Sequence, residues 1–281
     1  MPGKKTIITC AMTGSSAPKD KNPAVPVTPE EIAEDVYKVW KAGAAVVHLH
    51  MRDDELKNSL DTERFRKTFE LIRAHEDCDI IVNFTSSGKG TGLTTAQRLE
   101  HFTAIPGVEM GTYDAGTLNM NYKTIFENSP DFLVELGQCY QELGIKPEIE
   151  AFDAGWIGNV KHYVETGVLK EPAYYQLVMG AQGGCPATVD SLAYLVRQLP
   201  QGSMWSAFGI GAAHLPIMFA ALAMGGNIRV GLEDNIYYSK GVLATNEDLV
   251  KRAVRVVHEF GNEVATPSEA REMLGIPQLV R

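Results

Sequence analysis

The sequence predicts a (β/α)8 TIM barrel that forms a single domain over residues 1–281. Short runs rich in apolar and β-branched residues alternate with longer segments of helical periodicity along the whole chain, which is typical of parallel strands joined by crossover helices. Eight runs are strand-like, and no proline-rich linker divides them. An open doubly wound sheet is the alternative. It predicts a GxGxxG motif after the first strand, and MTGSSAPKDK from Met12 lacks one.

The eight predicted strands each end in polar residues or glycine. Active sites of TIM barrels lie at the C-terminal ends of the strands, so these polar ends predict a site there. The predicted strands cover residues 6–14, 45–52, 79–87, 108–116, 146–155, 174–184, 203–211 and 227–234.

The predicted helices lie between these strands. The first covers residues 28–43, where Thr28 is a capping residue, Pro29 occupies the first helical position and Gly43 ends the periodic pattern. The others cover residues 61–75, 130–144, 188–199 and 245–261.

Composition narrows the functional classes. With 44% hydrophobic and 22% charged residues, the chain resembles an ordinary globular protein. Its net charge of -9 argues against nucleic acid or an anionic membrane as a partner. The apolar stretch from Leu215 is shorter than the roughly 20 residues that span a bilayer. Four scattered cysteines without CxxC spacing suggest free thiols in a reducing compartment, so we expect a cytoplasmic protein.

Two histidines lie one residue apart in VVHLHMRDD, from Val46. On a strand, His48 and His50 point to the same face, where they could bind Zn²⁺ or a similar divalent ion. A lone HxH pattern is equally compatible with two hydrogen-bonded core histidines. The metal interpretation therefore requires a third ligand.

The eighth strand offers that ligand in RVGLEDN, from Arg229. Strands two and eight both flank strand one in a closed barrel, so Glu233 can approach His48 and His50 and complete a two-histidine, one-carboxylate set. Arg229 can pair with Asp234 and hold that carboxylate in orientation for proton abstraction. The alternative is a pair of solvated acids at a helix N-terminus.

Taken together, these motifs resemble the β-keto acid cleavage enzymes over essentially the whole chain. The resemblance rests on HLH, TSSG from Thr85, GTYDAGTLN from Gly111, PEIEAFDAG from Pro147 and GNIRVGLEDNIYYSKG from Gly226. It implies a barrel that is usually a homotetramer, with a divalent metal that is typically zinc. The implied activity is that of an acyltransferase, which converts a β-keto acid and acetyl-CoA into acetoacetate and a new acyl-CoA.

The resemblance also assigns residues. It implies that His48, His50 and Glu233 bind the metal and that the dyad of Arg229 and Asp234 is catalytic, with Asp234 as the base. The substrate carboxylate is implied to contact Thr85, Gly88 and Thr112.

Three positions depart from the family's 3-keto-5-aminohexanoate cleavage enzyme. Ser16 stands where that enzyme has the glutamate that pairs with the substrate's amino group, so the 5-amino substrate is not expected here. Asp114 replaces an asparagine and adds a potential negative charge. Trp156 replaces a smaller side chain and is expected to narrow the pocket or face a cationic headgroup. A hydroxylated, neutral or quaternary-ammonium β-keto acid, such as dehydrocarnitine, is the expected substrate.

Two other functions use the same residues. A metal-dependent lyase or hydrolase would employ His48, His50 and Glu233 without CoA. A non-catalytic sensor would bind metal or metabolite, but it does not explain why both Arg229 and Asp234 are present. The chain contains no GxSxG, HExxH or GxxxxGK[ST] motif.

Overall fold

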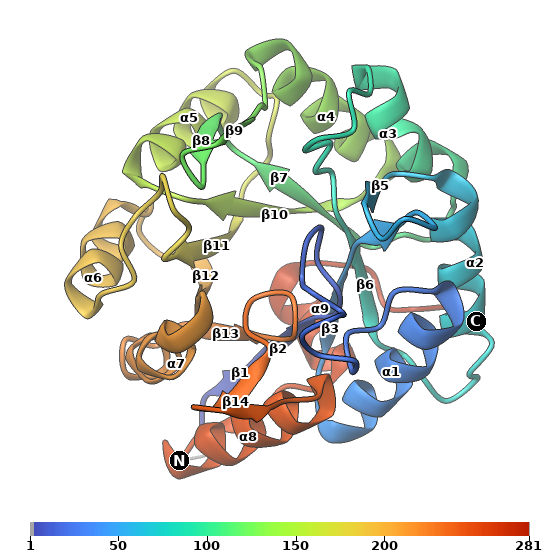
Figure 1. Ribbon diagram of the computed structural model, residues 1–281. Coiled ribbons are helices and arrows are strands. Elements are labelled where there is room, and N and C mark those ends of the chain that lie inside the picture. Colours follow the sequence, from blue (N-terminus) through green and yellow to red (C-terminus); the bar gives the residue numbers. More distant parts are fainter. Residues whose placement is uncertain (1–2, 281) are drawn as a thin grey trace.

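The computed structural model describes residues 3–280, which form a closed barrel of eight parallel strands inside a ring of helices (Figure 1). Around the barrel the strands follow chain order, and the last pairs with the first. The predicted (β/α)8 barrel is confirmed. Its strands are β2 (Ile8–Ala11), β3 (Val46–Leu49), β6 (Ile81–Phe84), β7 (Met110–Asp114), β10 (Lys146–Ala151), β11 (Tyr174–Met179), β12 (Met204–Gly209) and β13 (Asn227–Val230).

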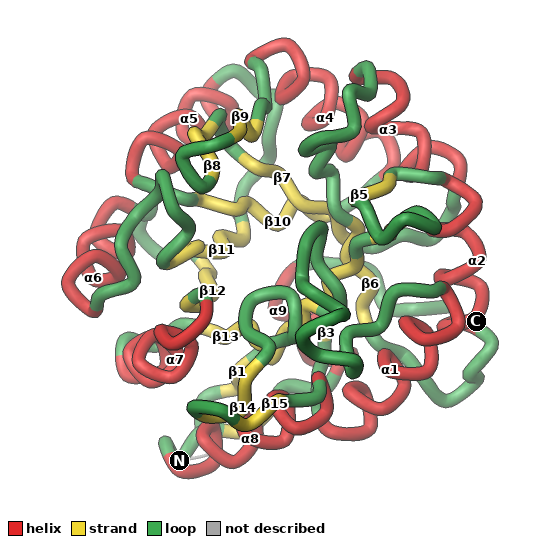
Figure 2. The backbone as a smooth tube through the Cα atoms, viewed as in Figure 1, coloured by secondary structure: helices red, strands yellow, loops and turns green. Residues whose placement is uncertain are grey.

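The barrel strands are shorter than predicted, because their polar C-terminal residues leave the ladder and form loops. The predicted strand at 146–155 ends at Ala151, since Asp153 caps the next helix by accepting the N–H groups of Gly155 and Trp156. Three antiparallel hairpins extend these loops: β4 (Met51–Arg52) with β5 (Asn58–Ser59), β8 (Leu118–Met120) with β9 (Thr124–Phe126), and β14 (Tyr237–Ser239) with β15 (Val242–Leu243). The loops surround the C-terminal end of the barrel, called the mouth below (Figure 2).

The five predicted helices are present as α1 (Pro29–Ala42), α2 (Thr62–Arg73), α4 (Pro130–Leu143), α6 (Val189–Gln198) and α8 (Asn246–Glu259). In α1 the side chains of Thr28 and Glu31 form a capping box, and Gly43 ends the helix with φ of 114°. The ring also contains α3 (Thr95–Ala104), α5 (Ala154–Glu165), the 3-10 turn η1 (Gly211–Ala213) and α7 (His214–Ala223).

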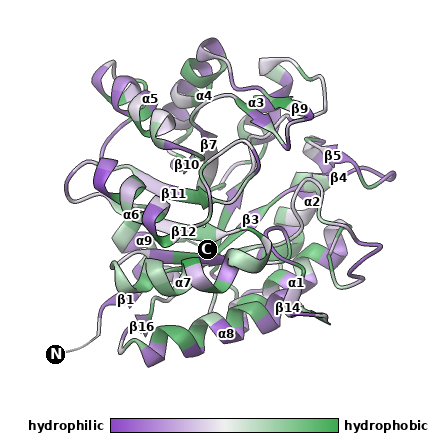
Figure 3. Cartoon of the chain, turned by 60° about the vertical axis from the view of Figure 1, so that its left-hand side comes forward, coloured by the Kyte–Doolittle hydropathy of each residue, from purple (hydrophilic) through white to green (hydrophobic). Residues whose placement is uncertain are grey.

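The core has two parts. The larger lies between the strands and the helices. Apolar and polar residues alternate along α8 (Figure 3), and its buried apolar residues, such as Leu249 and Val257, face this core. The smaller lies at the N-terminal end of the barrel, called the floor below, where Ala270 and Leu274 of α9 (Pro267–Leu274) pack against residues that begin the strands. β1 (Lys5–Thr6) and β16 (Glu263–Val264) pair beside it. Within the described chain, each helix is too short or too polar to cross a bilayer.

Candidate active site

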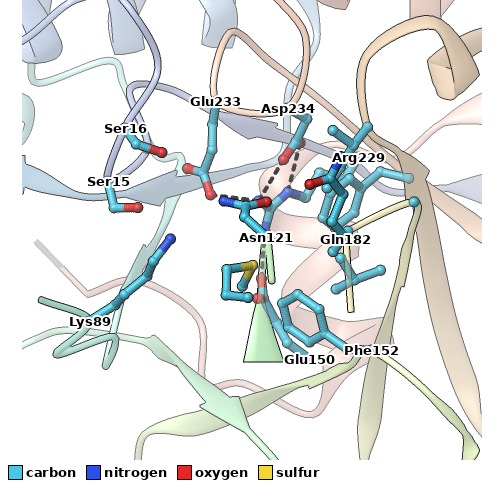
Figure 4. Close-up of a pocket in the computed structure, with 17 residues that line it drawn as sticks. Ser15, Ser16, Lys89, Asn121, Glu150, Phe152, Gln182, Arg229, Glu233 and Asp234 are labelled. Atoms are coloured by element: carbon cyan, nitrogen blue, oxygen red, sulfur yellow. Dashed lines mark hydrogen bonds and ion pairs between the residues drawn. The ribbon is translucent and has the colours of Figure 1, made fainter. Parts of the chain in front are cut away.

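Two adjoining cavities of about 440 Å³ and about 100 Å³ lie at the mouth of the barrel, and Figure 4 shows the larger one. The volume of the larger is within the range of small-molecule sites. Six residues line both: Ser15, Lys89, Met120, Glu150, Phe152 and Glu233. The smaller cavity is lined by His48 and His50, whereas the larger is lined by Arg229 and Asp234.

The two histidines come together with Glu233. His48 lies on β3, His50 follows the end of that strand, and their ring centroids are 4.9 Å apart. The Nε2 atom of each lies 3.6 Å from Oε1 of Glu233. One potential ligand atom from each residue lies within 4.8 Å of the other two. The three side chains could therefore hold one metal ion.

A glycine turn after β13 places the carboxylates. Gly231 has φ of 144°, and a Cβ atom there would lie 2.0 Å from the carbonyl oxygen of Ala11, so the turn requires glycine. Glu233 and Asp234 therefore belong to this turn and not to the predicted strand. Gly14 leaves room for Glu233, because a Cβ on Gly14 would lie 2.6 Å from the Cγ atom of Glu233.

Arg229 joins three carboxylates. Its Nε and Nη2 atoms each donate to Asp234 at 3.0 Å. Nη2 also donates to Oε1 of Glu233 at 2.8 Å, and Nη1 donates to Oε1 of Glu150 at 2.7 Å. The guanidinium carbon lies 4.2 Å from the ring centroid of Phe208. These contacts fix the plane of the guanidinium group and the orientation of Asp234.

The electrostatics of the site favour a bound cation. Burial lowers the pKa of His48 well below its ordinary value and that of His50 to about 4, so both imidazoles keep free lone pairs at neutral pH. Burial also raises the pKa values of Glu233 and Asp234 to about 7, although Arg229 opposes this. The Oε2 atom of Glu233 is buried without a hydrogen-bond donor among the described residues. The residues present thus fit a divalent metal ion.

The loop that follows β6 brings Thr85 to the smaller cavity. Behind it, the buried His101 contacts the carbonyl oxygen of Thr85 through Nε2 at 2.9 Å. His101 therefore supports the loop from inside.

Gly88 and Thr112 shape the same loop. The hydroxyl of Thr112 accepts the N–H of Ser86 at 2.9 Å. A Cβ atom on Gly88 would lie 2.7 Å from Nε of Arg98, and Arg98 itself donates from Nη2 to the carbonyl oxygen of Ser86 at 2.9 Å. Gly88 is thus part of the loop that carries Thr85, and Thr112 hydrogen-bonds to it from β7, but neither lines the two cavities.

The three departures from the family pattern have different surroundings. Ser16 lines the larger cavity. Asp114 lines the smaller one, where burial and the neighbouring Glu150 raise the pKa of Asp114 well above its ordinary value. Trp156 is buried in the core against Phe152 and Gly116. Trp156 lines neither cavity, so the expectation that it faces a cationic headgroup is wrong. The aromatic side chains that line the larger cavity are Phe152 and Phe208.

Sequence reasoning missed the roles of two residues. Glu150 was visible as a polar strand end, but its ion pair with Arg229 depends on the barrel's closure. Lys89 lines both cavities, but in the sequence it is distinguished only by its position between two glycines.

The chain is similar to known proteins over most of its length. The profile of the beta-keto acid cleavage enzyme family matches residues 5–276. The chain is 40% identical to the 3-keto-5-aminohexanoate cleavage enzyme of Fusobacterium nucleatum subsp. nucleatum, over 97% of this chain and 98% of that protein. It is 37% identical to the 3-dehydrocarnitine:acetyl-CoA trimethylamine transferase of Rhizobium meliloti, over 96% of each chain.

Among solved structures, the apo structure of ObcA superposes with a TM-score of 0.81 at 20% identity. The match covers 90% of this chain and 66% of ObcA. At this identity the likeness concerns the fold alone.

Proposed function

The chain belongs to the beta-keto acid cleavage enzyme family, and from this premise we propose that it condenses a β-keto acid with acetyl-CoA to give acetoacetate and a new acyl-CoA. The main support for the proposal is the position of Arg229, which donates to both oxygens of Asp234. Beside this pair, the carboxylate of Glu233 faces His48 and His50. This arrangement combines a base with a metal site at the mouth of a TIM barrel.

His48, His50 and Glu233 are proposed to hold the metal. Two imidazoles and one carboxylate suit Zn²⁺ and leave a position for substrate, so zinc is the metal we propose. When bound there, the ion supplies Lewis-acid polarisation of the substrate's keto oxygen.

Asp234 is proposed to remove a proton from the carbon between the keto and carboxylate groups of the substrate. Arg229 fixes the orientation of both oxygens of Asp234, so the base does not need to reorganise during the transfer. The side chain of Phe208 beneath Arg229 shields one face of this pair from water.

The proposed reaction forms one carbon–carbon bond and breaks another. The substrate carbanion attacks the thioester carbonyl of acetyl-CoA, a carbon–carbon bond forms, and CoA leaves as a thiolate. The thiolate then attacks the original keto carbon, whose bond to the α-carbon breaks. The proton held by Asp234 returns to the α-carbon, which yields acetoacetate. The rest of the substrate leaves as acyl-CoA.

The substrate carboxylate is proposed to bind at Thr85, which lines the same cavity as the two histidines. Gly88 and Thr112 contribute by shaping this loop. Ser16 is proposed to contact the far end of the substrate from the larger cavity. A serine there carries no charge to pair with an amine, so the amine-bearing substrate named for the Fusobacterium relative is not proposed for this chain.

Two further proposals follow from the family. We expect a homotetramer, as the resemblance implies, and a cytoplasmic location. The second is supported by four free cysteines, three of which are buried.

A substrate screen tests the function. Metal-loaded protein is incubated with a panel of β-keto acids and acetyl-CoA, and both acetoacetate and the new acyl-CoA are quantified by mass spectrometry. The expected result is formation of the two products in equal amounts.

Each reaction is repeated without acetyl-CoA as the control. Cleavage that proceeds equally well without acetyl-CoA would contradict the proposal and favour a CoA-independent lyase or hydrolase.

A further inference from the structure

One wall of the larger cavity is lined by hydroxyl groups and a cation. Ser15 and Ser16 lie beside Lys89 on the side opposite Phe152 (Figure 4). Lys89 also lines the smaller cavity with the two histidines and an outer groove of about 680 Å³. Its ammonium group is thus at the junction of the metal site, the larger cavity and solvent.

The backbone of Lys89 is tied to the metal site. The Nδ2 atom of Asn58 donates to the carbonyl oxygens of Ser87 and Lys89, both at 3.1 Å. The Oδ1 atom of the same Asn58 lies 3.4 Å from Nδ1 of His50. The side chain of Asn58 therefore fixes the backbone of Lys89 relative to His50, a proposed metal ligand. A lysine on a freely moving surface loop would lack this constraint.

Lys89 also differs from the other lysines of the outer groove. Lys19 pairs with Glu31 at 2.8 Å, and Lys57 pairs with Glu55. Within residues 3–280, no carboxylate pairs with Lys89, although its side chain is half-buried. A half-buried, unpaired ammonium group beside a cavity is matched by an anion from the ligand.

On the opposite wall Arg229 pairs with Glu150, Glu233 and Asp234, and the metal proposed at the two histidines and Glu233 would supply the remaining positive charge. A cationic group at the far end of the substrate would meet Lys89 without a carboxylate at Ser15 or Ser16 to balance it.

Resting on the proposed function, we infer that Lys89 selects β-keto acids whose far end carries a second carboxylate, with the hydroxyls of Ser15 and Ser16 beside it. The substrate's first carboxylate is a less suitable partner, because the loop at Thr85 is proposed to bind it deeper in the site. The phosphates of CoA are also less suitable, because the long pantetheine arm separates them from the thioester that reacts at the metal.

Two substrates of equal chain length test the inference: 3-oxoadipate, which has a second carboxylate, and 3-oxohexanoate, which ends in a methyl group. The ratio of their kcat/KM values is measured with acetyl-CoA for the parent, Lys89→Gln and Lys89→Arg. We expect the parent to prefer 3-oxoadipate and Lys89→Gln to lower the ratio by about tenfold or more. Lys89→Arg should retain the preference, because it keeps the charge.

A binding measurement provides a second readout. Calorimetric titration of 3-oxoadipate into metal-loaded protein without acetyl-CoA should show about tenfold or more weaker binding to Lys89→Gln, at unchanged metal content. Lys57→Gln is the matched control, since this lysine lines the same outer groove but pairs with Glu55, and it should leave the ratio unchanged.

The other outcomes are distinguishable. An equal loss on both substrates would mean that Lys89 contacts the carboxylate they share, and a rise confined to the KM for acetyl-CoA would mean that it contacts CoA phosphate. Either result overturns the inference, as does a parent that prefers 3-oxohexanoate. A parent that cleaves no β-keto acid with acetyl-CoA contradicts the proposed function itself.

Discussion

Buried charges gather at both ends of the barrel, but in opposite proportions. At the floor, one carboxylate is shared by two arginines: Glu109 accepts from Nε of Arg271 at 2.6 Å and from Nη2 of Arg73 at 2.7 Å. Each arginine also donates to a backbone carbonyl, of Asp79 and Ile80 respectively. At the mouth, one arginine is shared by three carboxylates.

The difference separates a structural cluster from a functional one. The donors at the floor are occupied by protein acceptors, and the cluster joins α2, β7 and α9. The mouth has one positive and three potential negative charges, and Glu233 keeps a buried oxygen without a donor. Only the mouth has an excess of carboxylates that a further cation would balance, so ligand removal and mutation should affect the two ends differently.

The largest effect is expected from His48→Ala. Loss of one of three proposed ligands should weaken metal binding by at least about a hundredfold and abolish turnover. Metal content is measured by mass spectrometry, and activity by acetoacetate formation. His162→Ala is the control, because His162 is exposed on α5, and it should match the parent in both measurements.

Chelating the metal should also affect the mouth and the floor of the barrel differently. Removing metal from the parent should abolish turnover, and adding Zn²⁺ should restore it, while the floor remains folded. A His48→Ala variant with the parent's metal stoichiometry and rate would refute the ligand assignment.

Asp234→Asn tests the base while leaving the proposed ligands in place. The amide keeps the shape of the side chain but cannot accept the proton, so kcat should fall by about 10²–10⁴-fold. The metal content should remain that of the parent, which distinguishes this variant from His48→Ala. Turnover at the parent's rate would exclude Asp234 as the base.

A mutation at the floor should change the free energy of unfolding and not the reaction. Glu109→Ala leaves Arg73 and Arg271 without their shared carboxylate in a buried site, which should cost about 3–5 kcal/mol of the free energy of unfolding. Metal affinity of the folded protein should not change. Denaturant titration and metal content provide the two measurements.

Glu263→Ala is the control for the floor. Its ion pair with Lys5 is exposed, so the loss should be less than about 1 kcal/mol. Equal destabilisation by both variants would show that the buried cluster has no special role in holding the floor.

The sequence predicted the barrel because strand and helix periodicity are local signals that repeat along the whole chain. It also brought His48, His50 and Glu233 together, because closure of the barrel makes strands one, two and eight neighbours. It placed Glu109 near the start of one predicted strand and Glu233 near the end of another, so only Glu233 was expected at the site, but it did not predict that Glu109 pairs with two arginines. The two arginines come from distant segments of the chain, and only the folded chain shows that Glu109 has both of them while Glu233 shares Arg229 with two other carboxylates.

The roles of Lys89 and Trp156 were beyond the sequence for a related reason. Whether a side chain after a strand faces the cavity or the core depends on where the strand ends and the next element begins. Residues 146–155 were predicted as one strand, but the helix cap at Asp153 turns Trp156 into the core.

Glu148 lies inside the barrel between the floor and the mouth. Its titration tests whether the excess negative charge is confined to the mouth. It is fully buried, and its Oε2 atom accepts from Nδ2 of Asn83 at 2.6 Å, while burial raises its pKa to about 8. The folded chain then holds a proton on Glu148 that the unfolded chain releases near its ordinary value of 4.5. This contribution to stability is complete below about pH 4.5 and is lost as the pH rises toward about 8.

Glu148→Gln removes the titration, so the melting temperature of the parent relative to the variant should fall as the pH rises from about 5 to about 8.5. Both proteins are measured with metal bound, so that changes at His48, His50 and Glu233 are common to the pair and cancel. A melting-temperature difference that is constant with pH, or that grows in favour of the parent, would show that Glu148 is ionised in the folded barrel and that excess negative charge extends below the mouth.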